Sequence, residues 1–524
     1  MWLFKKDNWG LWFVVSLLFS TVVIYALSFN RYGLIVENDS TIYIRGALNL
    51  HEGKGFTLAG KYISHFPVGL SYVYHMLMSL FPGTIFSVAF GLHLVLLLVA
   101  GFGFIYLMRQ LQLHSLVQSI TLFAFLFSVP IAETSLRMLS DFPFMCMILL
   151  SSLLLLRHIK APESMSCLWV IGLLLGITYL VRFAALGFLG AFLLIPFVLW
   201  PTQFKQNIKK ALALFIPCLV ILFSNKAYVA WKYQTVSVDR VLAWHPMHGS
   251  TLMNFPSTLF SWVLNYNNLS QHTTFVVGIL LVGIVLALWG VKKKNFFIEQ
   301  TVTSPSMYKK QVMRAFAVIC LSYCLFLIVS ISLFDAWTPI NTRLLSPLAV
   351  YVFLGLGLLL QGVYDQSKYP LLSISLSAAL AVLMSLSTIK LIVQARTRIP
   401  LGYNAPYWTT TGQEIANNRD GTWLTPQCAV YSNGIAFFAM QNDRMVMDLP
   451  YRFSPITQEN NTQFQNELNT MLLAIKKGAA RLVFFSNLPA PPFKIQEADL
   501  LTNFADSTQF EIHAFNQGFV VQGK

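Results

Sequence analysis

Residues 84–108 read TIFSVAFGLHLVLLLVAGFGFIYLM, a stretch of 25 residues without a charged side chain. About 20 mostly apolar residues in a helix cross the hydrocarbon core of a bilayer, so this stretch predicts a transmembrane helix. Similar stretches recur along the 524 residues of the chain. The sequence therefore predicts a polytopic α-helical membrane protein with about eleven spans, at approximately 9–29, 84–108, 115–130, 141–157, 167–181, 183–200, 211–230, 273–291, 313–333, 344–361 and 370–392.

The composition of the whole chain supports a membrane protein. Hydrophobic residues make up 56%, charged residues 11%, and the mean hydropathy is +0.61, whereas soluble domains carry about 25% charged residues. These values exclude a disordered chain and a disulfide-rich secreted module. They also exclude a nucleic-acid-binding protein, although the net charge is +15. Five of the six cysteines lie in apolar runs, which is typical of small buried side chains.

The basic residues predict the orientation, because Lys and Arg concentrate in short cytoplasmic loops. An inside amino terminus places Lys5, Lys6 and the VKKKN run at 291–295 in the cytoplasm. The first span lacks a small-residue cleavage site, so we expect a retained signal anchor. We therefore expect the chain in the inner (plasma) membrane, with its amino terminus inside and its carboxyl terminus outside.

Two regions depart from the pattern of spans. Residues 66–81, FPVGLSYVYHMLMSLF, have helical apolar spacing, but 16 residues rise only ~24 Å. We expect an interfacial helix there, in the first outer loop, ended by Pro82-Gly83. Residues 393–524 are polar, and we expect a small extracytoplasmic α/β domain after a transmembrane domain at 1–392. Its predicted strands are 429–432, 480–486, 510–515 and 518–523, and its predicted helices are 459–477 and 495–504.

The first outer loop contains an acidic pair, Glu37 and Asp39, before a predicted helix at 40–51. One interpretation is that Asp39 is a helix N-cap, since Ser and Thr follow it. The other is a general base, because a carboxylate beside an apolar helix is partly desolvated and gains proton affinity. The spacing alone favours the helix cap, and a carboxylate at this position can also serve as cap and general base together.

Other charged residues lie next to apolar spans on the same predicted face. Arginines there can be snorkelling anchors, and the acidic residues can be helix caps. Together, three arginines and several carboxylates on one face suggest a site for an anionic lipid headgroup, because the arginine fork gives bidentate hydrogen bonds to phosphate. The residues are Glu133, Arg137, Asp141, Arg182, Asp335 and Arg343.

These motifs, taken in order, resemble those of the bacterial GT-C superfamily of integral-membrane glycosyltransferases, which includes protein O-mannosyltransferases and lipid A aminoarabinose transferases. The resemblance covers nearly the whole chain. Phe66-Pro67 replaces the family's paired prolines, Asp141 its usual Glu, and Leu344 its Tyr. The matching stretches are Asp39, LHEGKGF (50–56), HFPVGLSYVY (65–74), LSDFPF (139–144), YLVRFAAL (179–186), INTRLLSPL (340–348) and YSNGIAFFAMQNDRMVMDLP (431–450).

The resemblance implies transfer of a sugar, with inversion, from a polyprenyl-phosphate-linked donor to a hydroxyl on a lipid, glycan or protein acceptor at the outer face. It implies that Asp39 is the catalytic base and that Arg182 and Arg343 bind the donor phosphate. It implies no certain cofactor, and a divalent cation is compatible with it. Sugar, acceptor or metal would be oriented by Asp141, Glu133 and Glu37, and the lipid groove would be lined by Phe66, Pro67 and Tyr74.

Two other functions stay open from the sequence. A lipid or glycan transporter or flippase usually has ionisable residues at mid-membrane and duplicated halves, whereas here only His93 lies in mid-span. A non-catalytic envelope scaffold is the second alternative.

Overall fold

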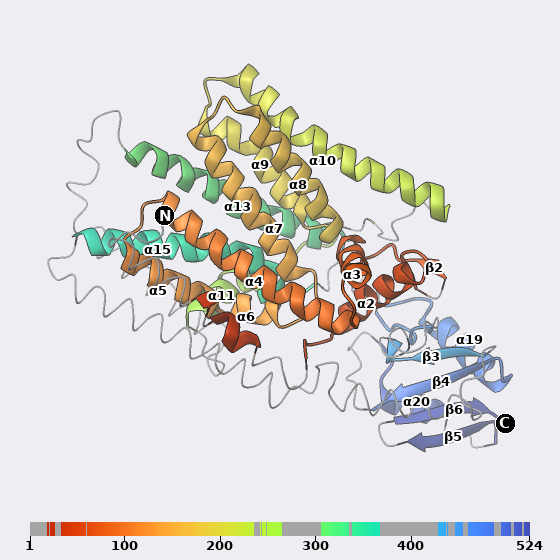
Figure 1. The fold of residues 1–524 in the computed structure, drawn as a ribbon. Coiled ribbons are helices and arrows are strands. Elements are labelled where there is room, and N and C mark those ends of the chain that lie inside the picture. Colours follow the sequence, from red (N-terminus) through yellow and green to blue (C-terminus); the bar gives the residue numbers. More distant parts are fainter. Residues whose placement is uncertain are drawn as a thin grey trace.

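The computed structural model describes most of a helical bundle and a small carboxyl-terminal sheet (Figure 1). The described residues are 18–19, 21–26, 33–58, 60–234, 242, 244–247, 249–264, 305–334, 338–366, 428–435, 438, 446–453, 459–486, 494–504, 508–515 and 518–524.

Long apolar helices form the bundle. Within the described residues, five are long and apolar enough to cross a bilayer. Helices α8 (Met165–Val181) and α9 (Ala185–Leu199) are apolar but shorter. The prediction of a multi-pass α-helical membrane protein is therefore confirmed. The five long helices are α4 (Ile85–Gln110), α7 (Asp141–Lys160), α10 (Phe204–Tyr233), α13 (Pro305–Phe334) and the run of α14 (Thr342–Leu345), η4 (Ser346–Leu348) and α15 (Ala349–Gln366).

The predicted span at 115–130 is broken. Helix α5 (Ser115–Leu126) ends early, and α6 (Val129–Ser135) follows at an angle of 48°. Pro130 lies in the first turn of α6, where its missing N–H is tolerated. The predicted spans at 273–291 and 370–392 lie outside the described residues, as does most of 9–29.

Close packing of α8 on α10 depends on two glycines one helical turn apart. A Cβ built on Gly172 would lie 2.2 Å from the carbonyl oxygen of Leu214, and one on Gly176 would lie 2.9 Å from Cβ of Ile221. Small residues at this spacing let two membrane helices approach until their backbones touch. Because α8 ends at Val181, this contact also fixes the position of the next residue, Arg182.

The first outer loop forms a compact unit at one end of the bundle (Figure 1). It contains α2 (Asn38–His51), the antiparallel pair β1 (Thr57–Leu58) and β2 (Lys61–Tyr62), and α3 (Gly69–Leu80). The predicted short helix at 66–81 is confirmed as α3, whose 12 residues rise ~18 Å. The unit has its own small apolar core of Phe56, Ile63 and Val68.

A tight turn anchors this loop on α10. Gly55 has a φ of +83°, and a Cβ there would lie 2.4 Å from the hydroxyl of Tyr233. Only glycine adopts this conformation without strain. The Tyr233 hydroxyl accepts a hydrogen bond from the backbone N–H of Phe56 at 2.9 Å. The GKGF turn is therefore fixed on the last residue of α10.

The carboxyl-terminal region forms a four-stranded sheet in the order β3-β4-β6-β5. Strands β3 (Ala429–Ser432) and β4 (Ala480–Phe485) are parallel, whereas β6 (Gly518–Gly523) pairs antiparallel with β4 and with β5 (Phe510–Phe515). Helices α19 (Phe464–Lys476) and α20 (Glu497–Asn503) accompany it. All four predicted strands are confirmed, while the predicted boundary at 392–393 lies outside the described residues.

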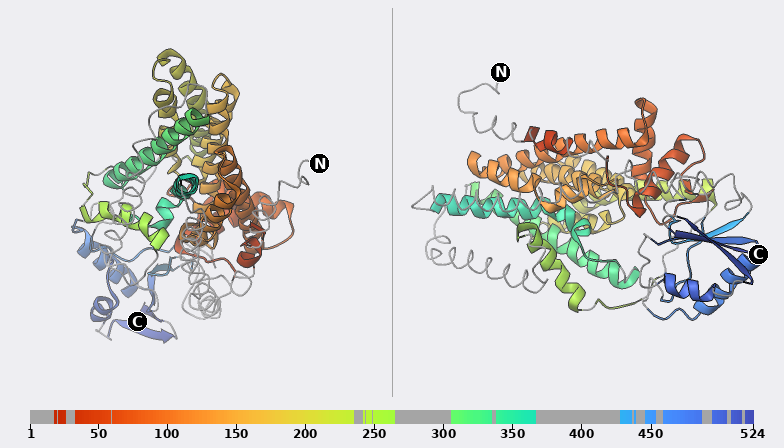
Figure 2. Two further views of the ribbon diagram at one scale, coloured as in Figure 1. Left: turned by 90° about the vertical axis from the view of Figure 1, so that its left-hand side faces the viewer. Right: turned by 90° about the horizontal axis from the view of Figure 1, so that it is seen from below.

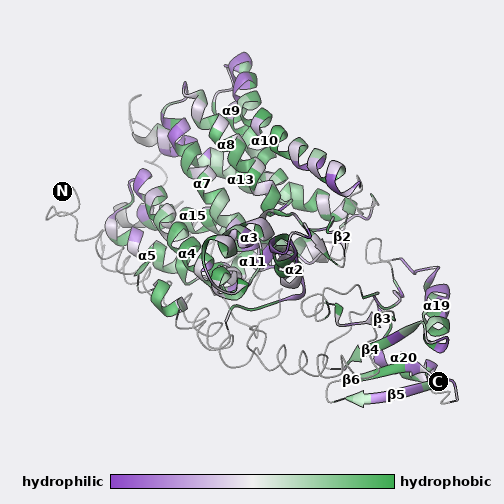
Figure 3. Cartoon of the chain, turned by 45° about the vertical axis from the view of Figure 1, so that its right-hand side comes forward, coloured by the Kyte–Doolittle hydropathy of each residue, from purple (hydrophilic) through white to green (hydrophobic). Residues whose placement is uncertain are grey.

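The sheet lies at the end of the bundle that carries α2 and α3, as Figures 1 and 2 show from three directions. Figure 3 shows that the bundle helices are hydrophobic along most of their length, while hydrophilic residues gather toward their ends. Functional polar groups are therefore to be sought at the ends of the bundle.

Candidate active site

Seven charged residues gather at the end of the bundle near α2. Four are acidic and three are arginines, and each contacts at least one residue of opposite charge. They come from four separate stretches of the sequence, at 37–39, 133–141, 182 and 343. This charged cluster consists of Glu37, Asp39, Glu133, Arg137, Asp141, Arg182 and Arg343.

Backbone pairing brings the first outer segment to the loop before α7. The N–H of Ile35 donates to the carbonyl of Leu136 at 2.8 Å, and the N–H of Met138 donates to the carbonyl of Ile35 at 3.0 Å. This places Glu37 against the guanidinium of Arg137, with which it forms an ion pair. Nη2 of Arg137 lies 2.9 Å from a carboxylate oxygen of Glu133, one turn earlier.

Arg343 lies at the centre of the cluster. Its Nη1 donates to Oε2 of Glu37 at 3.1 Å, and its Nη2 donates to Oδ2 of Asp39 at 3.0 Å. Its Nε lies 3.5 Å from Oδ2 of Asp141. A planar guanidinium holds its donors in a fixed fork toward several carboxylates, whereas an ammonium group has three donors without that rigid geometry.

A second arginine pairs with the buried carboxylate. Nη1 of Arg182 lies 2.9 Å from Oδ1 of Asp141, whose side chain is 1% exposed. Burial is the largest influence and lowers the pKa of Arg182, but the Asp141 carboxylate together with Tyr323 and Tyr43 outweighs it, and the pKa is raised. The guanidinium therefore remains charged. Neither oxygen of Asp141 takes part in a hydrogen bond of good geometry, so both keep capacity to accept one.

Asp39 is the accessible acid of the cluster. Its side chain is 43% exposed, compared with 23% for Glu37. Helix α2 begins at Asn38, and its N-cap is Glu37, whose backbone N–H donates to the hydroxyl of Ser40 at 3.0 Å. The interpretation of Asp39 as the N-cap is therefore wrong. Its carboxylate lies in the first turn and points to Arg343 instead.

The structure also places the three residues expected in the lipid groove. Pro67 and Tyr74 are buried, and Tyr74 has no exposed surface. Phe66 is partly exposed and packs edge-on against Tyr43, with ring centroids 5.5 Å apart. Of the three, only Phe66 offers surface to a ligand in this conformation. Asp335 lies outside the described residues.

Two neighbours of the cluster were missed in the sequence. Tyr43 lies four residues after Asp39 on α2, and its hydroxyl is 3.0 Å from Oγ of Ser140. Nη1 of Arg182 donates to the same Ser140 hydroxyl at 3.3 Å. Burial raises the pKa of Tyr43 to about 12, although Arg182 acts in the opposite direction. The four-residue spacing from Asp39 was the available signal for Tyr43; Ser140 had only its place beside Asp141.

The cluster does not resemble a metal site. Among the residues that the structure describes, no three His, Cys, Asp or Glu side chains are arranged to hold a metal ion. The carboxylates of the cluster face guanidinium groups. As arranged, the seven residues offer fixed positive charge and one accessible carboxylate, which suits binding of an anion beside a proton acceptor.

No protein-family model and no curated protein matches the chain. Among solved structures, ArnT from Cupriavidus metallidurans bound to undecaprenyl phosphate is similar with a TM-score of 0.56 and 13% identity, covering 99% of this chain and 98% of that chain.

Two further structures support the same likeness. The Archaeoglobus fulgidus oligosaccharyltransferase has a TM-score of 0.52 at 11% identity, covering 96% of this chain and 73% of that chain. Arabinofuranosyltransferase AftD from Mycobacteria also has a TM-score of 0.52, at 13% identity, covering 99% of this chain and 40% of that chain. All three are GT-C glycosyltransferases. At the level of fold, the chain resembles the GT-C membrane glycosyltransferases, as its motifs indicate.

Proposed function

We propose that this chain is an inverting glycosyltransferase that moves a sugar from a polyprenyl-phosphate-linked donor to a hydroxyl acceptor at the outer face of the membrane. The observation that carries the proposal is the contact of Asp39 with Arg343 across 304 positions of sequence, in a cluster that also holds Arg182. A proton acceptor and two guanidinium groups are thereby held at one end of a membrane bundle.

The proposed reaction uses these groups in a single displacement. The Asp39 carboxylate accepts the proton of the acceptor hydroxyl. At the same time, the oxygen of that hydroxyl attacks the anomeric carbon of the sugar. The bond from that carbon to the phosphate oxygen breaks, and polyprenyl phosphate leaves with the electron pair. Arg182 and Arg343 stabilise the charge that develops on the leaving phosphate. General-base catalysis contributes ~10²–10⁴-fold, and fixed positive charge at the leaving group adds to this.

The contacts of Arg343 suggest how donor binding prepares the base. All three carboxylates around Arg343 compete with an incoming phosphate. Asp39 is the most exposed of them at 43%, whereas Asp141 is buried at 1%. We infer that the donor phosphate displaces Asp39 from Arg343. The released carboxylate then accepts the proton, so that binding of the donor precedes activation of the acceptor.

The remaining carboxylates would orient the sugar. Both oxygens of Asp141 are buried and accept no hydrogen bond from the described residues, so they would reach sugar hydroxyls once the donor opens the cluster. Glu37 and Glu133 pair with Arg137, so their first role is to hold the cluster together. Phe66 would contact the lipid next to the phosphate, while Pro67 and Tyr74 would support it from inside.

The proposal includes a topology. Eleven spans with the amino terminus inside place the charged cluster and the carboxyl-terminal domain on the extracytoplasmic side of the inner membrane. The sheet lies at the same end of the bundle as α2 and α3 (Figure 2). It would cover the site or select the acceptor there.

A direct test uses the full-length protein in liposomes with a panel of polyprenyl-phosphate sugars and candidate hydroxyl acceptors. We expect one donor to be consumed, polyprenyl phosphate to be released, and the product to have inverted anomeric configuration by NMR. The variant Glu52→Gln, at an exposed acid beside the end of α2, is the matched control for Asp39→Asn. Transfer by Asp39→Asn at the wild-type rate would remove the catalytic assignment.

The same liposomes separate the alternatives. A transporter or flippase would move an intact lipid-linked sugar to the other leaflet without releasing polyprenyl phosphate. A scaffold would do neither with any donor of the panel. The gathering of charge at one end of the bundle favours transfer, because transport pathways place ionisable groups at mid-membrane.

A further inference from the structure

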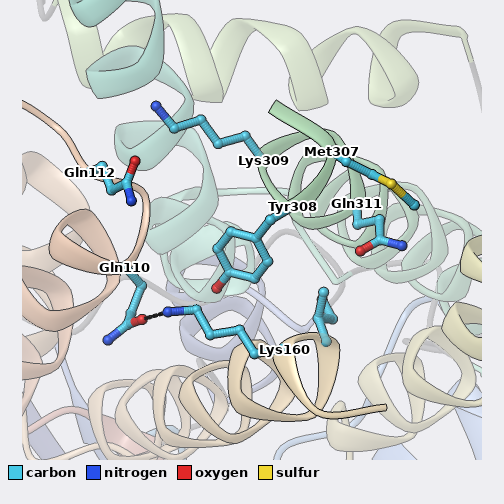
Figure 4. A pocket seen from close by; sticks show the side chains of 8 residues that line it. Gln110, Gln112, Lys160, Met307, Tyr308, Lys309 and Gln311 are labelled. Carbon is cyan, nitrogen blue, oxygen red and sulfur yellow. Dashed lines mark hydrogen bonds between the residues drawn. The ribbon is translucent and has the colours of Figure 1, made fainter. Parts of the chain in front are cut away.

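The other end of the bundle contains a cavity of about 420 Å³, which is in the range of small-ligand sites. It lies between the last residues of α4 and α7 and the first two turns of α13 (Figure 4). We call it the lysine cavity. It is lined by Gln110, Gln112, Ile159, Lys160, Met307, Tyr308, Lys309 and Gln311.

Helix α7 connects the lysine cavity to the charged cluster. Asp141 is its first residue and Lys160 its last, a length of 20 residues. Such a helix is ~30 Å long, about the thickness of the hydrocarbon core. In a bilayer that α7 crosses, the lysine cavity therefore lies at the surface opposite the charged cluster, and it is a separate site.

The lining of the lysine cavity favours an anion. Two of its eight residues are lysines and none is acidic. The ammonium of Lys160 donates to Oε1 of Gln110 and lies 5.1 Å from the centre of the Tyr308 ring. Figure 4 shows Lys309 on the other side of that ring. Three glutamine amides and the Tyr308 hydroxyl add neutral hydrogen-bonding groups.

The helix ends around the cavity fit the same ligand. Helix α13 begins at Pro305, so its amino-terminal end, which favours anions, faces this region. Helices α4 and α7 end here with their carboxyl termini, which favour cations. Their last turns carry Arg109, Arg157 and Lys160, which offset that charge.

Exposed apolar side chains continue from the cavity along the same helices. Met307 at its rim is 59% exposed, and Tyr106 and Phe102 on α4 are 51% and 50% exposed. Such side chains on a spanning helix face lipid tails. A ligand with a charged head and acyl chains would therefore contact both surfaces, which a soluble anion would not.

We propose that the lysine cavity binds the phosphate headgroup of an anionic phospholipid, in the leaflet opposite the charged cluster. Lys160 and Lys309 would contact the phosphate, and the glutamine amides and Tyr308 would bind headgroup hydroxyls such as those of phosphatidylglycerol. The acyl chains would follow the outer surfaces of α4 and α13. This proposal does not depend on the reaction catalysed at the other end of the bundle.

Native mass spectrometry of the delipidated full-length protein tests this proposal with phosphatidylglycerol, phosphatidylcholine and soluble glycerol 3-phosphate as probes. The test variant is Lys160→Gln/Lys309→Gln. The matched control is Lys205→Gln/Lys209→Gln, which removes two exposed lysines from the start of α10 at the same end of the bundle. The melting temperature of each variant without lipid shows whether it remains folded.

We expect phosphatidylglycerol to bind the wild-type protein more tightly than phosphatidylcholine does. The double variant Lys160→Gln/Lys309→Gln should bind phosphatidylglycerol about tenfold or more weakly than wild type. The control pair should remain within about twofold of wild type. Equal losses of phosphatidylglycerol affinity in the test and control double variants would overturn the proposal. Equal affinity of the wild-type protein for both lipids would also overturn it. Glycerol 3-phosphate that binds as tightly as the lipid would overturn the assignment to a lipid.

Discussion

Arg343 has the largest number of ion pairs in the charged cluster: its Nη1 and Nη2 donate to Glu37 and Asp39, and its Nε lies 3.5 Å from Asp141. This arrangement keeps Asp141 paired although its side chain is buried. An unpaired buried carboxylate would be costly, so the two arginines around Asp141 stabilise the fold as well as offering charge to a ligand. At the residue scale, stability and proposed chemistry therefore share the same groups.

The variant Arg343→Lys tests the role of the planar guanidinium group. Lysine keeps the charge but is a single point charge, so we expect the KM for the donor to rise by about tenfold or more, with a smaller change for the acceptor. Steady-state kinetics with each substrate varied in turn measure this split. Arg109→Lys, at the opposite end of the bundle, is the matched control. Equal changes for donor and acceptor would indicate a structural role instead.

The variant Asp39→Asn tests the base. We expect the transfer rate to fall by about 100-fold or more because the amide cannot accept the proton. The melting temperature should change little, since Asp39 is 43% exposed. Thermal unfolding monitored by size-exclusion chromatography, together with the transfer rate, checks both expectations. A large loss of stability in Asp39→Asn, but not in Glu52→Gln, would contradict the expectation that Asp39 serves catalysis and not stability.

The sequence alone identified the residues of the cluster but not their partners. Asp39 was selected as an acid before the predicted helix of the first outer loop, and Arg182 and Arg343 as arginines beside apolar spans. The contact of Arg343 with Asp39 joins residues 304 positions apart, and helix packing determines it. For the same reason, the position of Tyr43 against Ser140, 97 positions away, could not be predicted.

At the scale of elements, periodicity and turn residues predicted most helices and all four carboxyl-terminal strands. The break between α5 and α6 was missed because the apolar run continues through Pro130, although that proline was a signal for it. Its ring clashes with the carbonyl four residues earlier, at Leu126, where α5 ends, and the chain turns by 48°. The start of α2 was placed two residues late, since Asp39 looks like a cap and Glu37 does not. Short pieces such as β1 and β2 have two residues each and no sequence period.

The contact between α8 and α10 makes a prediction at this scale. Gly172→Ala would place a methyl group 2.2 Å from the Leu214 carbonyl oxygen, so the helices must separate. We expect a destabilisation of ~1–3 kcal/mol, seen as a lower melting temperature. Gly190→Ala in α9 is the control, because a Cβ there meets nothing within 4 Å. The control should be neutral or gain up to ~1 kcal/mol from helix propensity. Equal melting temperatures for the two variants would show that the close approach does not stabilise the bundle.

At the scale of the whole molecule, the expected orientation depends on loop charges. Cys428 is only 7% exposed and is a poor site for labelling. Lys477→Cys places a thiol on an exposed turn after α19, and Lys209→Cys places one at the start of α10. We expect a membrane-impermeant thiol reagent to label Lys477→Cys in intact spheroplasts, and Lys209→Cys only after permeabilisation. Wild type gives the background. The opposite pattern would reverse the orientation.

The central claim is that the charged cluster binds the phosphate of a polyprenyl-linked donor beside Asp39. A cryo-EM structure of the full-length protein with polyprenyl phosphate tests it most directly. We expect phosphate density within hydrogen-bonding distance, about 3 Å, of the guanidinium groups of Arg182 and Arg343, with Asp39 released from Arg343. Phosphate density only at the opposite end of the bundle, with the contact of Asp39 and Arg343 unchanged, would contradict the claim.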